Sequence, residues 1–271
     1  MNNPYQPILA IILETRDETP NIRTFVLKPE REIPFLAGQF VELTVPGFGE
    51  APFTPSSSQF KRDTFEMTVM KVGRATGALF ELKPGDIVGA RGPFGTPYPL
   101  EKFAGKDIYI VGGGVGLAPL RALFLALTHE PTKYGRIFLR YGARTPSDIV
   151  YRHLLPEWQK MPKVDIDLSV DVSDEKWMKR VGVVTCLMDE IPCDEKTSIA
   201  VVCGPPIMMK LVNQRLLHVG FKADNIYLSM ETNMSCGVGQ CRHCRLGPYL
   251  TCKDGPVLTW SQIKDIQDPF V

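Results

Sequence analysis

The chain has 271 residues, 44% of them hydrophobic and 23% charged, which is enough for two domains of ordinary size and a small appended segment. The 31 Lys and Arg residues nearly balance the 30 Asp and Glu residues, which excludes a polybasic surface for nucleic acid or anionic lipid. The N-terminus has no basic stretch before its apolar run and no small-residue cleavage pattern, so we expect a cytoplasmic protein without a secretory signal.

The N-terminal part of the chain is predicted to be mostly β-strand. Its apolar segments are rich in Val, Ile, Phe and Thr, partly alternate with polar residues, and are separated by turn clusters such as ETPN and KPGD. Short strands at this spacing predict a small antiparallel barrel, interrupted by one short helix at 76–82. The predicted strands are 8–15, 22–28, 39–45, 65–72 and 86–91.

After Gly105 the pattern changes to apolar runs that alternate with helical segments, which predicts parallel βαβ units. The last long helix is expected to end at Gly220, a residue type favoured just after a helix. The apolar stretch 108–127 contains Arg121 and four glycines, so we interpret it as strand, loop and helix rather than as a transmembrane segment. The predicted strands are 107–111, 136–142, 164–170, 198–203 and 225–230; the predicted helices are 117–128, 147–160, 184–190 and 207–219.

A glycine-rich turn follows the first strand of this second region. Gly112-Gly113-Gly114-Val115-Gly116-Leu117-Ala118 leaves room for a pyrophosphate to approach backbone N–H groups at the start of the next helix. The run lacks the strict G-x-G-x-x-G fingerprint of ordinary dehydrogenases. Glycines of this kind also occur in turns for purely structural reasons, so nucleotide binding and a simple turn are both open at this point.

A second candidate lies at the end of a later buried strand, where Cys203 is followed by Gly204, Pro205 and Pro206. Open α/β sheets bind ligands at the carboxyl ends of their strands, which favours a ligand contact here. Considered alone, these residues are explained equally well by structure: Cys203 as a core residue, and Gly-Pro-Pro as the end of the strand.

The most specific pattern is the spacing Cys236-x4-Cys241-x2-Cys244-x7-Cys252. Cys-x4-Cys-x2-Cys with a distant fourth cysteine is the plant-type spacing for a [2Fe–2S] centre. Gly237 and Gly239 would allow backbone N–H groups to reach the sulfurs. Structural zinc is the main alternative, although zinc sites usually use Cys-x2-Cys pairs. Free thiols without a bound metal are the second alternative.

Taken together, the pattern predicts a β plus α/β protein with three parts. We expect an N-terminal antiparallel Greek-key β-barrel domain over residues 1–103 and a parallel α/β nucleotide-binding domain over 104–228. A small C-terminal iron–sulfur segment is expected over 229–271.

The ordered combination of a barrel, GGGVGLAP, CGPPIMM and a terminal cysteine cluster resembles the ferredoxin–NADP reductase superfamily. It is most similar to the branch of electron-transfer subunits that carry a C-terminal [2Fe–2S] centre. That branch includes the electron-transfer subunit of dihydroorotate dehydrogenase, the γ subunit of cytoplasmic NiFe hydrogenases and the B subunit of anaerobic sulfite reductase. The resemblance covers essentially the whole chain and implies FAD bound by the first domain and NAD(P) by the second.

The resemblance also implies flavin-binding residues. The family's Arg-x-aromatic-Ser/Thr motif corresponds to Ala51-Pro52-Phe53-Thr54, with Phe53 against the flavin and the Thr54 hydroxyl at flavin N5. Ala51 stands where the family has an arginine for the pyrophosphate, and Arg74 is a candidate to supply that charge. A barrel edge and turn would also explain Phe53 and Thr54. The second flavin segment implied by the resemblance supplies Gly73, Ala75 and Thr76.

By the same resemblance, the NAD(P) site would use Gly113, Gly114, Gly116, Leu117 and Ala118, together with Cys203, Gly204 and Pro205 beside the nicotinamide. Arg144 follows the second strand of the domain, where it could pair with a 2′-phosphate and favour NADP, although an exposed arginine is more often only solvated. The residues implied in the chemistry are Thr54, Cys203 and Glu231, the last as a candidate for proton handling. The implied cluster ligands are Cys236, Cys241, Cys244 and Cys252.

These parts predict an NAD(P)H-dependent oxidoreductase that relays electrons between NAD(P)H, FAD and a [2Fe–2S] cluster. Flavin exchanges both hydrides and single electrons, so it can connect a nicotinamide to an iron–sulfur cluster. The sequence contains no catalytic triad and no further metal motif, so we expect a partner catalytic subunit of the hydrogenase or sulfite reductase type. Two alternatives are a free-standing reductase of a ferredoxin-type acceptor and a flavin-free module on a reductase scaffold.

Overall fold

The computed structural model describes residues 3–270 and separates into two compact units. The barrel unit contains the residues up to Tyr98 together with Arg121–Ala126 and Met230–Val257. The α/β unit contains Pro99–Leu120, Leu127–Ser229 and the residues from Leu258 onward. The domain limits expected from the sequence stay predictions.

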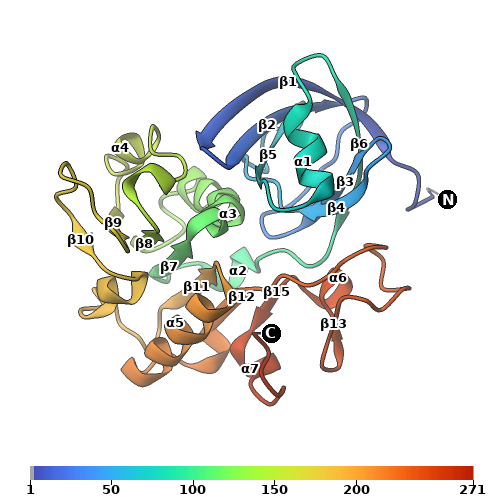
Figure 1. Cartoon of the computed structure of the whole chain (residues 1–271). Coiled ribbons are helices and arrows are strands. Elements are labelled where there is room, and N and C mark those ends of the chain that lie inside the picture. Colours follow the sequence, from blue (N-terminus) through green and yellow to red (C-terminus); the bar gives the residue numbers. More distant parts are fainter. Residues whose placement is uncertain (1–2, 271) are drawn as a thin grey trace. The chain divides into compact units, whose positions relative to one another are not determined.

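The barrel unit is built on a six-stranded antiparallel sheet with the strand order β4-β3-β6-β1-β2-β5 (Figure 1). The two edge strands, β4 and β5, contact one another, so the sheet curls around its own core. The predicted antiparallel N-terminal domain is confirmed. Its elements are β1 (Ile8–Thr19), β2 (Ile22–Pro29), β3 (Phe40–Val45), β4 (Gly49–Phe53), β5 (Phe65–Met70), α1 (Arg74–Glu81) and β6 (Ile87–Phe94).

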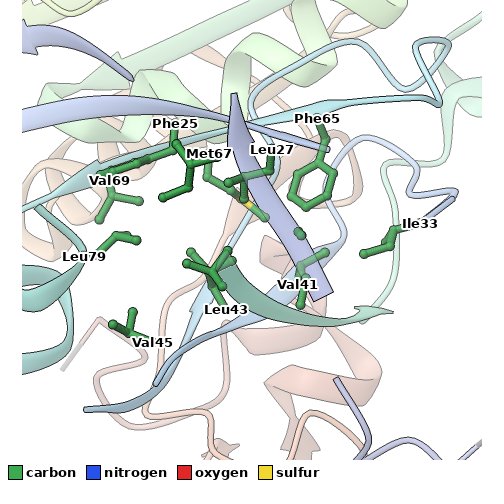
Figure 2. Packing of buried hydrophobic residues seen from close by; sticks show 14 of the residues in the cluster. Phe25, Leu27, Ile33, Val41, Leu43, Val45, Phe65, Met67, Val69 and Leu79 are labelled. Carbon is green, nitrogen blue, oxygen red and sulfur yellow. The ribbon is translucent and has the colours of Figure 1, made fainter. Parts of the chain in front are cut away.

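Figure 2 shows the core of this unit, where apolar side chains from β2, β3, β5 and α1 meet. Val41 and Leu43 of β3 enter this core (Figure 2). Because side chains alternate along a strand, Phe40 and Glu42 belong to the opposite face of the sheet, where Phe40 packs with Cys244 and Cys252. That opposite face carries the cysteine segment described below.

Strand β4 was not predicted, because its segment contains Gly49 and Pro52 and therefore has the composition of a turn. It pairs with β3 over Val41–Val45 all the same, with Pro52 opposite Glu42. Proline is tolerated at this position because β4 is an edge strand of the sheet.

The α/β unit is built on a seven-stranded sheet in the order β10-β9-β8-β7-β11-β12-β15, and its strands from β10 to β12 pair in parallel. The order reverses between β7 and β11, which is the topological switch point of a doubly wound sheet. The strands are β7 (Ile108–Gly113), β8 (Ile137–Ala143), β9 (Val164–Val170), β10 (Arg180–Val181), β11 (Ile199–Cys203), β12 (Ile226–Ser229) and β15 (Val257–Thr259). The helices are α2 (Leu100–Phe103), η1 (Gly114–Gly116), α3 (Leu117–His129), η2 (Pro146–Asp148), α4 (Leu155–Trp158), η3 (Val184–Met188), α5 (Pro206–Val219), η4 (Ala223–Asn225) and α7 (Trp260–Ile263).

Two helix predictions in this unit were wrong. The segment 147–160 was expected to be one helix, but it forms only η2 and the short α4. Tyr151 has a left-handed φ of 55°, which a continuous right-handed helix cannot contain. The segment 184–190 forms a 3-10 helix over Val184–Met188. By contrast, α5 ends as expected, with Gly220 at φ 110°.

The remaining elements lie in the cysteine segment: β13 (Arg245–Leu246), β14 (Tyr249–Leu250) and α6 (Thr251–Asp254). None of the helices within residues 3–270 combines the length and the apolar character that a membrane crossing requires.

Candidate functional site

The four clustered cysteines lie in the barrel unit, on the segment between β12 and β15. Cys236, Cys244 and Cys252 are buried, whereas Cys241 is exposed. The thiols fall into two pairs. The Sγ atoms of Cys244 and Cys252 are 3.2 Å apart, and both the backbone N–H and the thiol of Cys241 hydrogen-bond to Cys236.

Backbone N–H groups surround the cysteine sulfurs. Gly239 donates to Cys252 Sγ at 3.2 Å, and Gln240 donates to Cys236 Sγ at 3.3 Å. Burial acts to raise the pKa of the Cys236 thiol, but the N–H donors of Cys241, Val238 and Gln240 outweigh it and lower this pKa to about 6. Burial and the neighbouring Cys244 thiol raise the pKa of Cys252 to about 12. The loop therefore already stabilises negative charge on its first sulfur.

The four cysteines supply sulfur donors of the kind that an iron–sulfur cluster requires. Thiols in two pairs, with N–H groups directed at their sulfurs, are consistent with an iron–sulfur site, in which the sulfurs accept hydrogen bonds.

The barrel holds the cysteine segment along β6 and the loop that follows it. Phe40 packs against Cys244 and Cys252, and the rings of Phe40 and Phe94 are 5.7 Å apart. A Cβ at Gly237 would lie 2.7 Å from the Phe94 ring, so this turn requires glycine. At the other end of the segment, the Thr96 N–H donates to the Gly255 carbonyl at 2.6 Å.

Arg91 of β6 also forms polar contacts with this segment, and the sequence interpretation missed it. Its side chain is 4% exposed and pairs with the Glu50 carboxylate, with an Nη2–Oε2 distance of 2.7 Å. It also donates to the carbonyls of Ser235 and Cys236 at 3.0 and 2.9 Å. A charged residue inside the otherwise uncharged run IVGARGPF was the available signal.

Glu42 of β3 is the second residue that was missed, a charged side chain inside the apolar strand FVELTV. It is 0% exposed, and neither carboxylate oxygen has a hydrogen-bond partner within the described residues. Burial raises the pKa of Glu42 to about 7, with Arg91 acting against the shift and Glu50 and Cys236 adding to it.

The predicted flavin residues come together at α1 and the neighbouring β4, which contact each other. Helix α1 begins at Arg74 after Gly73, with no acidic residue in its first turn. Its first intrahelical bond runs from the Gly77 N–H to the Gly73 carbonyl at 2.7 Å, which leaves the N–H groups of Arg74, Ala75 and Thr76 without a helical partner. Unpaired N–H groups at a helix start are suited to an anion such as a pyrophosphate.

The side chains around this helix start have separate functions. The Thr76 hydroxyl accepts the N–H groups of Val72 and Gly73 at 3.0 and 2.9 Å, so it braces the turn, and only its backbone N–H is left for a ligand. The exposed Arg74 guanidinium lies 5.8 Å from the Phe48 ring centroid. Pro52, Phe53 and Thr54 are half-buried at the end of β4, and Ala51 pairs with Leu43.

The predicted nicotinamide nucleotide residues also come together, at the switch point of the parallel sheet. Cys203 at the end of β11 pairs with Gly112 at the end of β7. A Cβ at Gly116 would lie 2.5 Å from the Cys203 carbonyl oxygen, and one at Gly113 would lie 2.2 Å from Met208 Sδ. Gly114 differs, because it has φ 54° and an added Cβ would meet no atom within 4 Å. Leu117 and Ala118 are buried at the start of α3, and Gly204 and Pro205 precede α5.

Two predicted residues lie apart from these groups. Arg144 is exposed directly after β8. Glu231 is exposed shortly after β12, at the start of the cysteine segment. No hydrogen bond fixes either side chain, as far as residues 3–270 show, so their roles stay predictions.

Comparison with known proteins places three domain types along the chain. Residues 10–98 match the oxidoreductase FAD-binding domain and residues 110–214 the oxidoreductase NAD-binding domain. Residues 231–264, which contain all four clustered cysteines, match the iron-sulfur cluster binding domain of dihydroorotate dehydrogenase B. The matched ranges agree with the order of parts expected from the sequence.

Full-length relatives and solved structures agree with these matches. The sulfhydrogenase 2 subunit gamma of Pyrococcus furiosus is 36% identical, with 95% of this chain and 96% of the relative covered. The probable dihydroorotate dehydrogenase B (NAD(+)) electron transfer subunit of Methanocaldococcus jannaschii is 33% identical, with 97% and 93% covered. A structure of an NADH-dependent reduced ferredoxin-NADP oxidoreductase superposes with a TM-score of 0.77 at 25% identity, covering 98% of this chain and 94% of that one. The chain therefore belongs to the family of FAD- and NAD-binding oxidoreductases with a C-terminal iron–sulfur domain that includes the sulfhydrogenase gamma and dihydroorotate dehydrogenase B electron transfer subunits.

Proposed function

We propose that this chain is an electron-transfer subunit that connects NAD(P)H, FAD and a [2Fe–2S] cluster to a partner catalytic subunit. The observation that carries the proposal is the set of four cysteines in two thiol pairs, held on a flavin-type barrel. Together, the bound groups would supply the conversion between a two-electron hydride and single electrons.

The barrel unit would bind FAD through two elements. The unpaired N–H groups at the start of α1 would hold the pyrophosphate, and Arg74 in the same turn would add the positive charge that Ala51 lacks. Phe53 would lie against the flavin ring, and the Thr54 hydroxyl would donate a hydrogen bond to it. The backbone therefore replaces a side chain as the main anion ligand.

The α/β unit would bind the nicotinamide nucleotide at the switch point. Gly114 has the open backbone that a pyrophosphate needs, while Gly113 and Gly116 allow the turn to pack against the end of β11. Cys203 and Gly204, at the end of β11, are proposed to contact the nicotinamide. Arg144 is proposed to favour the 2′-phosphate of NADP.

The [2Fe–2S] type is proposed from the pairing of the thiols. Cys236 with Cys241 and Cys244 with Cys252 would each bind one iron, which matches the plant-type spacing. The inward N–H groups of Gly239 and Gln240 would stabilise the added negative charge when the cluster is reduced. Glu231 is proposed as a proton-handling residue at the start of the same segment.

The partner is proposed from the names of the relatives, which are subunits of sulfhydrogenase and of dihydroorotate dehydrogenase B. A hydrogenase-type or dihydroorotate dehydrogenase-type catalytic subunit is therefore favoured over a sulfite reductase type. Exposed Cys241 would place one edge of the cluster towards that subunit.

The proposal is tested by purifying the chain anaerobically from native cells with any untagged partner attached. We expect stoichiometric FAD, with about two irons and about two acid-labile sulfides per chain. NADH or NADPH should bleach the flavin absorbance. Stoichiometric zinc in a colourless protein would contradict the cluster assignment. A protein without flavin that still holds iron would contradict the relay.

A free-standing reductase is the second candidate, and the same preparation distinguishes it. A monomer that reduces a ferredoxin-type acceptor with NAD(P)H and carries no co-purifying subunit would favour it. Constant co-purification of one catalytic subunit through successive columns would favour the complex.

A further inference from the structure

Arg91 is a buried side chain that joins the cysteine segment to the barrel through hydrogen bonds. Every N–H of its guanidinium has an acceptor: Nε and Nη2 bond to Glu50, Nη2 also to the Ser235 carbonyl, and Nη1 to the carbonyls of Pro4 and Cys236. The side chain is 4% exposed, so these bonds replace its hydration. Only an arginine can supply so many donors from one planar group.

The hydrogen-bond acceptors of the Arg91 side chain indicate its role. Two of them are the carbonyls of Ser235 and Cys236, which are the first cluster cysteine and its neighbour. In a trans peptide the C=O and N–H point in opposite directions, so turning the Cys236 carbonyl to Arg91 turns the Gly237 N–H away from it. The bond to Arg91 holds the Cys236 backbone in place, and the Sγ that this backbone carries accepts the N–H groups of Gln240 and Cys241 at 3.3 and 3.5 Å.

Glu50 and aromatic rings hold the guanidinium in place. The Glu50 carboxylate accepts hydrogen bonds from two guanidinium nitrogens of Arg91. It also accepts one from the Thr44 hydroxyl, at 2.7 Å. The Arg91 guanidinium carbon lies 5.4 Å from the Phe94 ring centroid and 5.9 Å from that of Tyr5. The Tyr5 hydroxyl in turn donates to the Gln240 side chain in the cysteine loop.

We infer that Arg91 is a positioning residue for the iron–sulfur cluster: by bonding the Ser235 and Cys236 carbonyls it holds the Cys236 backbone, and thereby keeps the Cys236 sulfur among the N–H groups that bond it. The inference rests on the proposed iron–sulfur function and deepens it. It assigns part of the cluster's support to the barrel strand β6, which lies outside the cysteine segment itself.

The test compares wild type with Arg91→Gln and Arg91→Lys after anaerobic loading, using the full chain. The readouts are iron and acid-labile sulfide per FAD, loss of iron to a chelator, the EPR spectrum of the dithionite-reduced protein and its cluster reduction potential. We expect Arg91→Gln to lose iron about tenfold faster and to change the EPR line shape. Arg91→Lys keeps the charge with fewer donors, so we expect an intermediate rate and an altered spectrum.

Arg23→Gln is the matched control, because Arg23 also bonds a carboxylate and a backbone carbonyl, those of Asp17 and Phe80, without touching the cysteine segment. Glu50→Gln is a milder second variant for the case in which Arg91→Gln folds poorly. It keeps Arg91 and its carbonyl acceptors, so we expect smaller changes in the same readouts. Identical iron loss, line shape and potential in wild type, Arg91→Gln and Glu50→Gln would overturn the inference. A wild-type protein that binds no iron would instead overturn the proposed function.

Discussion

Glu42 and Arg91 lie directly opposite one another on β3 and β6, yet within the described residues Glu42 accepts no hydrogen bond while Arg91 is bonded on every N–H. Arg91 gives its donors to Glu50 and to the cysteine segment, which leaves a buried carboxyl beside it. Burial raises the pKa of Glu42 from its ordinary 4.5 to about 7.

The pH dependence of stability follows from this buried carboxyl. The folded protein binds the Glu42 proton more tightly than the unfolded chain, so the free energy of unfolding should fall as the pH rises from 4.5 through about 7. Glu42→Gln cannot ionise and should flatten this fall, which thermal unfolding at about pH 4.5 and about pH 8 would measure. The exposed Glu32→Gln is the control. Equal midpoint differences between wild type and Glu42→Gln at both pH values would contradict the prediction.

Substitutions of two glycines in the nucleotide turn should distinguish a glycine needed for packing from one needed for nucleotide binding. Gly116→Ala places a Cβ against the Cys203 backbone, so we expect it to destabilise the protein by about 1–3 kcal/mol or more. Gly114→Ala meets no protein atom but must keep a left-handed φ, a cost of about 1–2 kcal/mol. We expect Gly114→Ala to weaken NAD(P)H binding in titrations of the oxidised protein beyond what its unfolding midpoint explains. Unchanged nucleotide affinity would place the pyrophosphate elsewhere.

Loss of the charge at Arg74 should loosen FAD. A charge-assisted hydrogen bond contributes about 1.5–3 kcal/mol, so Arg74→Ala should raise the Kd for FAD about tenfold or more. FAD content after gel filtration and fluorescence of released flavin measure the effect. Arg31→Ala, at another exposed arginine of the barrel unit, should retain its flavin. If FAD content were the same in all three proteins, the N–H groups of α1 alone would suffice.

The preference between NADH and NADPH should depend on Arg144. If this side chain pairs with a 2′-phosphate, Arg144→Ala should weaken NADPH binding about tenfold and leave NADH unchanged. Rates of flavin reduction at several concentrations of each nucleotide give the two affinities, and Arg152→Ala serves as an exposed control. A wild type that already prefers NADH would count against a phosphate contact at Arg144.

Short-range patterns in the sequence predicted much of this protein. The strand and helix periodicities gave the two sheets, and the cysteine spacing gave the cluster segment, because both are set by residues close together in the chain. The prediction of a helix over 147–160 failed because the left-handed Tyr151 has no signature in an otherwise helical composition. Strand β4 was missed because an edge strand can contain the glycine and proline of a turn.

The amino-acid sequence by itself thus determined the order of the parts, the four cysteines and the glycine-rich turn. Only the tertiary structure decided that Arg91, far from Cys236 in the chain, donates to the Cys236 carbonyl, and that Gly116 is needed for the approach of Cys203. The physical reason is that such contacts depend on strand pairing and register, which bring distant residues together through hydrogen bonds that no local pattern encodes.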